Sequence, residues 1–151
     1  MNIEKLKYSD LDFLHNLDKN SFLKFWDIKN LSEEILNPNS FNFGVFEQSN
    51  FNNEKFLKAA ILGRIIFDEY WIFKIMTHSN FRRSGLAGKL IQKLITTLKT
   101  ERKICAKSIW LEVSVQNRGA IQFYQKNGFQ IITKRLRYYP EDAFIMCLML
   151  K

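Results

Sequence analysis

The stretch Phe81-Arg82-Arg83-Ser84-Gly85-Leu86-Ala87-Gly88 connects two segments of opposite periodicity. Before it, residues 70–76 (YWIFKIM) are aromatic and β-branched with one lysine, which is typical of a buried strand. After it, apolar residues recur at helical spacing from Leu86 to Leu98, with polar residues on the opposite face. The sequence therefore predicts a strand, a turn of small residues and an amphipathic helix.

This turn is suited to binding a phosphate group. A helix leaves the N–H groups of its first turn without intrahelical partners, and its dipole places about half a positive charge there. Three of residues 85–88 are glycine or alanine, which leave room for an anion, and Arg82 and Arg83 add positive charge. The alternative is a tight packing turn with two solvated arginines. A P-loop is excluded, because Arg83 replaces its first glycine and Leu90 its magnesium-binding hydroxyl.

A second strand is predicted over residues 108–115 (SIWLEVSV), with one carboxylate, Glu112, inside it. Burying an unpaired carboxylate is costly, so Glu112 either pairs with a basic neighbour or serves in chemistry. Asn117 then predicts the N-cap of a short helix that carries Tyr124. Gly128 predicts the end of that helix, before another strand.

The rest of the chain completes one mixed sheet. Residues 1–8 predict a strand, Ser9-Asp10 cap a helix, residues 31–36 form a second helix, and residues 41–47 and 57–68 form a hairpin. The expected order is strand, two helices, three strands, helix, strand, helix and two strands. Such an order predicts a single α/β domain over residues 1–151, with helices on both faces of the sheet.

Composition limits the possible partners. The 151 residues are 46% hydrophobic, as expected of one ordered domain, and the net charge of +8 suits an anionic partner. Lysine-rich composition alone also accounts for this charge, and no nucleic-acid-binding signature accompanies it. Cys105 and Cys147 lack metal-ligand spacing, so we expect reduced cysteines and no metal. No apolar run is long enough to span a membrane and no signal peptide is evident, which predicts a cytoplasmic protein.

Residues from about 75 to 146 resemble the GNAT family of acetyl-CoA-dependent N-acetyltransferases. The family's phosphate motif (Gln or Arg, two residues, Gly, one residue, Gly or Ala) corresponds to Arg82 through Ala87. Within the family, the chain most resembles the bacterial ribosomal-protein alanine N-acetyltransferases. The segments that carry this resemblance are Ile109–Val113, Asn117, Ala120-Ile121, Tyr124, Gly128-Phe129, Arg137–Pro140 and Glu141–Met146. The chain departs from the family at His78-Ser79, where Asp-Pro is common.

The resemblance implies a fold and an acetyl-CoA site. The fold would be a GNAT-like, mostly antiparallel sheet with helices on both faces. The end of the first strand would pair its backbone with the pantetheine arm, the turn would hold the pyrophosphate, and an asparagine would contact the cofactor from the neighbouring strand. The residues implied are Ile75, Met76 and Thr77, then Arg83, Ser84, Gly85, Leu86, Ala87 and Gly88, and lastly Asn117.

The resemblance also implies catalytic roles. Glu112 would be the general base, acting directly or through water, and Tyr124 the acid that protonates the leaving thiolate. Tyr138 and Tyr139 would line the acceptor pocket, although packing within a hairpin is an alternative. The implied function is acetylation of a protein N-terminus, for example that of a ribosomal protein. Acetylation of a small-molecule amine, and a catalytically silent acyl-CoA-binding module, are the alternatives.

Overall fold

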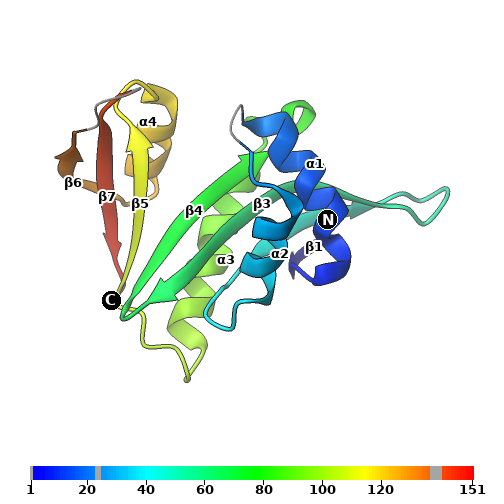
Figure 1. Ribbon diagram of the computed structural model, residues 1–151, viewed down its shortest axis with the longest axis horizontal. Coiled ribbons are helices and arrows are strands. Elements are labelled where there is room, and N and C mark those ends of the chain that lie inside the picture. Colours follow the sequence, from blue (N-terminus) through cyan, green and yellow to red (C-terminus); the bar gives the residue numbers. More distant parts are fainter. Residues whose placement is uncertain (1, 23–24, 137–140) are drawn as a thin grey trace.

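The computed structural model describes residues 2–22, 25–136 and 141–151, and it contains one mixed sheet with helices on both faces (Figure 1). Within these residues, seven strands follow the order β1-β2-β3-β4-β5-β7-β6, and only β4 and β5 pair in parallel. The strands are β1 (Asn2–Lys5), β2 (Phe43–Gln48), β3 (Lys55–Ile66), β4 (Glu69–Thr77), β5 (Ser108–Ser114), β6 (Gln130–Arg135) and β7 (Ala143–Met149). The helices are α1 (Leu11–Ser21), α2 (Ile28–Leu36), α3 (Leu86–Thr100) and α4 (Arg118–Lys126).

The predicted mostly antiparallel α/β sheet is confirmed, but several boundaries shift. The hairpin strands predicted over residues 41–47 and 57–68 are Phe43–Gln48 and Lys55–Ile66. Local contacts explain the shifts of the first strand and the second helix. The first strand ends at Lys5 because the chain then turns into a short 3₁₀ helix, Tyr8–Asp10, whose Asp10 Oδ2 accepts from the Lys7 backbone N–H at 2.9 Å. The second helix begins at Ile28, earlier than predicted, because Asp27 Oδ1 caps it by accepting from the Asn30 N–H at 2.8 Å.

Two hydrophobic clusters cover the two faces of the sheet. On β3, Ala59 and Ile61 pack in the cluster that contains α3 and α4 residues, whereas Ala60 and Leu62 pack in the cluster that contains α1 and α2 residues. This alternation follows from the two-residue period of a strand. Figure 1 shows α1 and α2 on one face and α3 on the other.

A bulge interrupts that alternation in β4. Leu62 pairs with Lys74 and the next residue, Gly63, pairs with Ile72, so Phe73 has no opposite partner. An extra residue moves the following side chains to the other face. Ile72 accordingly packs in the α3 cluster, whereas Lys74 reaches α1 on the opposite face.

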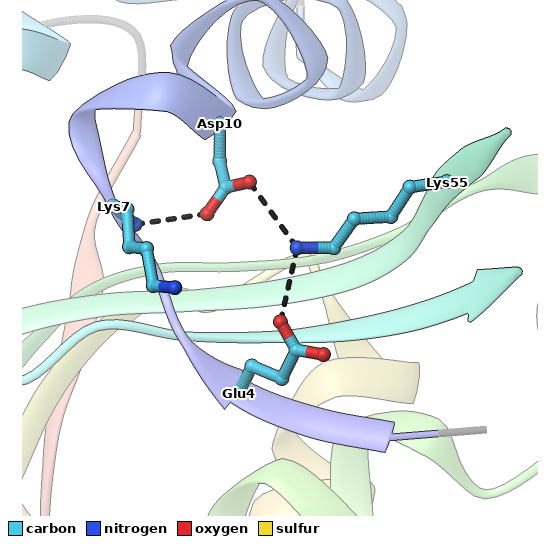
Figure 2. A network of polar contacts seen from close by, with 4 residues as sticks. All are labelled: Glu4, Lys7, Asp10 and Lys55. Carbon is cyan, nitrogen blue, oxygen red and sulfur yellow. Dashed lines mark hydrogen bonds and ion pairs between the residues drawn. The ribbon is translucent and has the colours of Figure 1, made fainter. Parts of the chain in front are cut away.

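A polar network fixes the beginning of α1 to the sheet (Figure 2). The Lys55 ammonium on β3 lies 2.9 Å from Glu4 Oε2 and 3.5 Å from Asp10 Oδ1. Burial lowers the pKa of Lys55, but its hydrogen bond to Glu4 and the charges of Asp10 and Glu4 outweigh this and raise the pKa above its usual value. The network thus connects β1, the 3₁₀ helix and β3.

Candidate active site

The sheet opens between β4 and β5. Their parallel pairing covers only Glu69–Ser108, Tyr70–Ile109 and Trp71–Trp110. Figure 1 shows the two strands separating toward their C-terminal ends. Residues 75–77 therefore have a neighbouring strand on the β3 side and none on the β5 side among the described residues. A ligand can bind to the backbone along this free edge.

A cavity of about 460 Å³ lies at this edge, and we call it the strand cavity. It brings together Ile75, Met76 and Thr77 with Asn117, which are four of the residues that the resemblance implies for cofactor binding. The Asn117 side chain caps α4, because its Oδ1 accepts from the Ala120 N–H at 3.2 Å. The capping bond leaves the amide NH₂ of this side chain as a donor for a ligand. The other lining residues are Ser21, Phe22, Arg82, Ala87, Gly119, Ala120 and Phe123.

A second cavity, of about 540 Å³, covers the start of α3, and we call it the loop cavity. Gly85 is the N-cap of α3 at φ +81°, and a Cβ built on it would meet no atom within 4 Å. The Leu86 side chain is buried in the core, so the first turn presents its backbone to this open space. Arg83 and Lys126 add positive charge to the lining. Open space, backbone N–H groups and two cations fit a pyrophosphate.

The two arginines of the turn line different cavities. Arg83 lines the loop cavity, whereas Arg82 lines the strand cavity, where its Nε donates to the Thr77 carbonyl at 3.4 Å. Ser84 is not among the lining residues, because its hydroxyl donates to the Phe81 carbonyl within the turn. The remaining predicted residues of the turn line the loop cavity; they are Gly85, Leu86, Ala87 and Gly88.

A third cavity, of about 580 Å³, we call the tryptophan cavity. Its aromatic lining residues are Trp26, Trp71 and Phe73. Its charged lining residues are Glu112, Arg135 and Glu141. Aromatic faces and carboxylates together suit a cationic or amine ligand.

Glu112 lies on β5 in the lining of the tryptophan cavity, with its side chain 22% exposed. Arg135 Nη1 on β6 donates to Glu112 Oε2 at 3.1 Å. The carboxylate therefore pairs with a basic neighbour, which was one of the two predictions for Glu112; the other was a role in chemistry. Glu112 also lines the cavity, so its catalytic role stays a prediction.

Tyr124 lies in the core beside the cavities rather than in their linings. Its side chain is 7% exposed, and its ring contacts Phe123 and Phe129 at centroid distances of 5.3 and 5.6 Å. Burial raises the pKa of Tyr124 well above its usual value, which keeps the phenol protonated. Phe123, the adjacent residue on α4, lines both the strand and the loop cavity.

Several lining residues were not predicted. Tyr138 and Tyr139, predicted to line the acceptor pocket, lie outside the described residues. Trp26 and Arg135 were missed because they reach the tryptophan cavity from separate parts of the chain.

A cluster of His, Cys, Asp or Glu suited to a metal is absent from the described residues. In the same residues, no helix combines the length and apolarity needed to cross a membrane.

Comparison with known proteins identifies the family. Residues 11–129 match the Acetyltransferase (GNAT) family, to which the chain belongs. The ribosomal protein bS18-alanine N-acetyltransferase of Escherichia coli K12 is 31% identical over 155 residues, which cover 97% of this chain and 95% of that protein. The protein of the same name from Salmonella typhimurium is 36% identical over 97 residues, or 61% of this chain and 64% of that protein.

Solved structures agree with this assignment. The crystal structure of the ribosomal-protein-S18-alanine N-acetyltransferase from Escherichia coli superposes with a TM-score of 0.84 at 27% identity, covering 99% of this chain and 94% of that one. Arabidopsis thaliana NAA60 in complex with a bisubstrate analogue gives 0.83 at 13% identity, covering 99% of both chains, which shows the fold alone. The chain is therefore an N-acetyltransferase, and acetyl-CoA is its acetyl donor.

Proposed function

We propose that residues 1–151 form a single domain that acetylates the α-amine of a protein N-terminus, such as that of a ribosomal protein. The tryptophan cavity carries this proposal, because it combines an aromatic wall with Glu112 and is open to an acceptor. The Escherichia coli relative, which covers 97% of this chain, is named for the alanine of ribosomal protein bS18. An acceptor of this kind places the enzyme in the cytoplasm.

We assign the donor side to the strand and loop cavities. The backbone of Ile75, Met76 and Thr77 would pair with the pantetheine arm along the free edge of β4, and one N–H there would polarise the thioester carbonyl. The turn of residues 83–88 would hold the pyrophosphate through backbone N–H groups, and Asn117 would contact the arm from α4. When bound, acetyl-CoA supplies an activated acetyl group and a thiolate leaving group.

Two side chains would move the protons. A protein α-amine has a pKa near 8, so at neutral pH a carboxylate such as Glu112 suffices to remove its proton, directly or through one water. Tyr124 would protonate the leaving thiolate, and its raised pKa keeps that proton on the phenol beforehand. Tyr138 and Tyr139 are proposed to complete the acceptor site.

One assay distinguishes the possible acceptors. The parent protein and acetyl-CoA are incubated separately with a free-amine peptide, the same peptide blocked at its N-terminus but carrying lysine, and spermidine. We expect turnover of the free-amine peptide, because a lysine amine with a pKa near 10.4 is almost fully protonated. Preferential turnover of spermidine would favour the small-amine alternative. Binding of acetyl-CoA without turnover of any acceptor would favour the silent module.

A further inference from the structure

A buried ion pair connects α1 to β4. Lys74 Nζ lies 2.5 Å from Asp18 Oδ1, and the two side chains are 7% and 0% exposed. The second Asp18 oxygen accepts from the Trp26 backbone N–H at 2.9 Å. The Lys74 ammonium also lies 4.8 Å from the Phe22 ring centroid and 5.0 Å from that of Trp26. Asp18 and Lys74 thus contact both described ends of the connection between α1 and α2.

Stability alone does not explain such a pair. Both charges lose their hydration on burial, and buried ion pairs replaced by apolar residues often leave a fold equally or more stable. The pair instead fixes the position of Trp26. Asp18 accepts a hydrogen bond from the Trp26 backbone, and the Lys74 ammonium lies against the Trp26 ring. The bulge at Phe73 turns Lys74 toward α1, so this arrangement depends on an irregularity of β4.

The pair also lies between two of the cavities. Phe73 and Ile75, which flank Lys74 on β4, line the tryptophan cavity and the strand cavity respectively. Across from them, Trp26 lines the tryptophan cavity, and its ring lies 6.2 Å from that of Phe73. Phe22 lines the strand cavity. Each residue that the pair contacts on the connection therefore forms part of a cavity wall.

We propose that Asp18 and Lys74 are positioning residues that fix Trp26 as a wall of the acceptor site. The proposal rests on the proposed function, in which the tryptophan cavity takes the acceptor. The pair touches neither the acceptor nor the acetyl group; it acts through Trp26. Loss of the pair leaves the loop cavity unchanged, because none of the residues lining that cavity contacts Asp18 or Lys74 among the described interactions.

The main test is Lys74→Met, which keeps the length of the side chain and removes its charge. We expect the KM for the free-amine peptide to rise roughly tenfold and the Kd for acetyl-CoA to rise by less than about threefold. The smaller effect on the donor is expected because the pair contacts Phe22 in the strand cavity but no residue of the loop cavity, which is proposed to hold the pyrophosphate. The indole N–H resonance of Trp26, assigned with Trp26→Phe, should shift in the absence of any acceptor. Lys55→Met is the matched control, because Lys55 ties the other end of α1 to the sheet; it should move neither readout.

A rescue variant separates positioning from stability. In Asp18→Asn combined with Lys74→Met, the amide oxygen can still accept from the Trp26 N–H and no buried charge is left unpaired, so the acceptor KM should return to within about threefold of the parent. If Lys74→Met does not fold, Asp18→Glu replaces it: the longer carboxylate displaces Trp26 while both charges remain, and the acceptor KM should rise.

Two results are decisive. An unchanged acceptor KM together with an unchanged Trp26 resonance, in folded Lys74→Met or in Asp18→Glu, would overturn the positioning role. If the parent turns over no peptide but the Trp26 resonance shifts in Asp18→Glu, in which both charges remain, and not in Lys55→Met, the positioning role stands and the proposed acceptor is wrong.

Discussion

Two tyrosines, Tyr70 and Tyr124, are buried in the same hydrophobic cluster. The Tyr70 hydroxyl donates to the Phe41 carbonyl at 2.6 Å and fixes the chain before β2. Tyr124 packs its ring against Phe123 and Phe129, next to the strand and loop cavities. At the residue scale, Tyr70 therefore has a structural hydroxyl, and Tyr124 is the tyrosine proposed to donate a proton.

Removing each hydroxyl tests this difference. Tyr124→Phe should lower kcat by about 10²–10³, within the range for a lost proton donor, and leave the Kd for acetyl-CoA unchanged. Tyr70→Phe should instead cost about 1 kcal/mol of unfolding free energy and leave kcat unchanged. Steady-state kinetics, calorimetric binding and chemical denaturation measure the three quantities. A Tyr124→Phe variant as active as the parent would reduce Tyr124 to a core aromatic.

The proposed base can be tested in the same way. Glu112→Gln keeps an oxygen that accepts from Arg135 but cannot take a proton, so kcat should fall by roughly 10²-fold or more while the affinity for acetyl-CoA is retained. Asp68→Asn is the control, since Asp68 is half exposed, faces Lys107 and lines none of the three cavities. Equal losses of kcat in both variants would contradict a specific role for Glu112.

At the element scale, the sequence predicted those features that depend only on neighbouring residues, such as the two ends of α4. Asn117 caps α4, and Gly128 ends it at φ +96°, both as predicted, because caps involve neighbouring residues only. The bulge at Phe73 was not predicted, because it depends on the register against β3. The tryptophan cavity was missed for the same reason: the bulge and the α1–α2 connection bring Phe73 and Trp26 together. Pairing between distant segments leaves no periodic pattern in the sequence of either segment, so these contacts could not be predicted.

The start of α3 yields a prediction with an internal control. Gly85→Asp puts a carboxylate where phosphate is proposed to lie, so acetyl-CoA binding should fall at least 100-fold, by an order-of-magnitude estimate for like charges at close range. Gly85→Ala meets no atom within 4 Å and adds only the strain of φ +81°, about 1 kcal/mol, so its binding should remain close to that of the parent. Isothermal titration calorimetry of both variants distinguishes repulsion between the new carboxylate and the phosphate from an effect of backbone strain. Equal losses would attribute the effect to backbone strain.

At the scale of the whole molecule, the network of Figure 2 makes stability depend on pH. The folded protein raises the pKa of Lys55 above 10.5, so the stabilisation is fully present below pH 10.5 and is lost as pH rises through the higher folded-state value. Denaturation curves from pH 9 to about 12 should show this loss in the parent and a smaller one in Lys55→Met. A variant with the same alkaline profile as the parent would assign the loss to other groups.

The sheet consists of two parts, β1–β4 and β5–β7, which meet through three residue pairs and the stacked rings of Trp71 and Trp110. The strand cavity lies beyond this short contact, between β4 and α4. A ligand bound there contacts both parts, so its binding energy also opposes their separation.

At a concentration one hundred times its Kd, acetyl-CoA should stabilise the fold by about 2.7 kcal/mol and raise the Tm by about 5–10 °C. At the same acetyl-CoA concentration the shift should fall to about 2 °C or less in Gly85→Asp and persist in Glu112→Gln, which retains the donor site. Absence of a shift in the parent would contradict the assignment of the strand and loop cavities to acetyl-CoA.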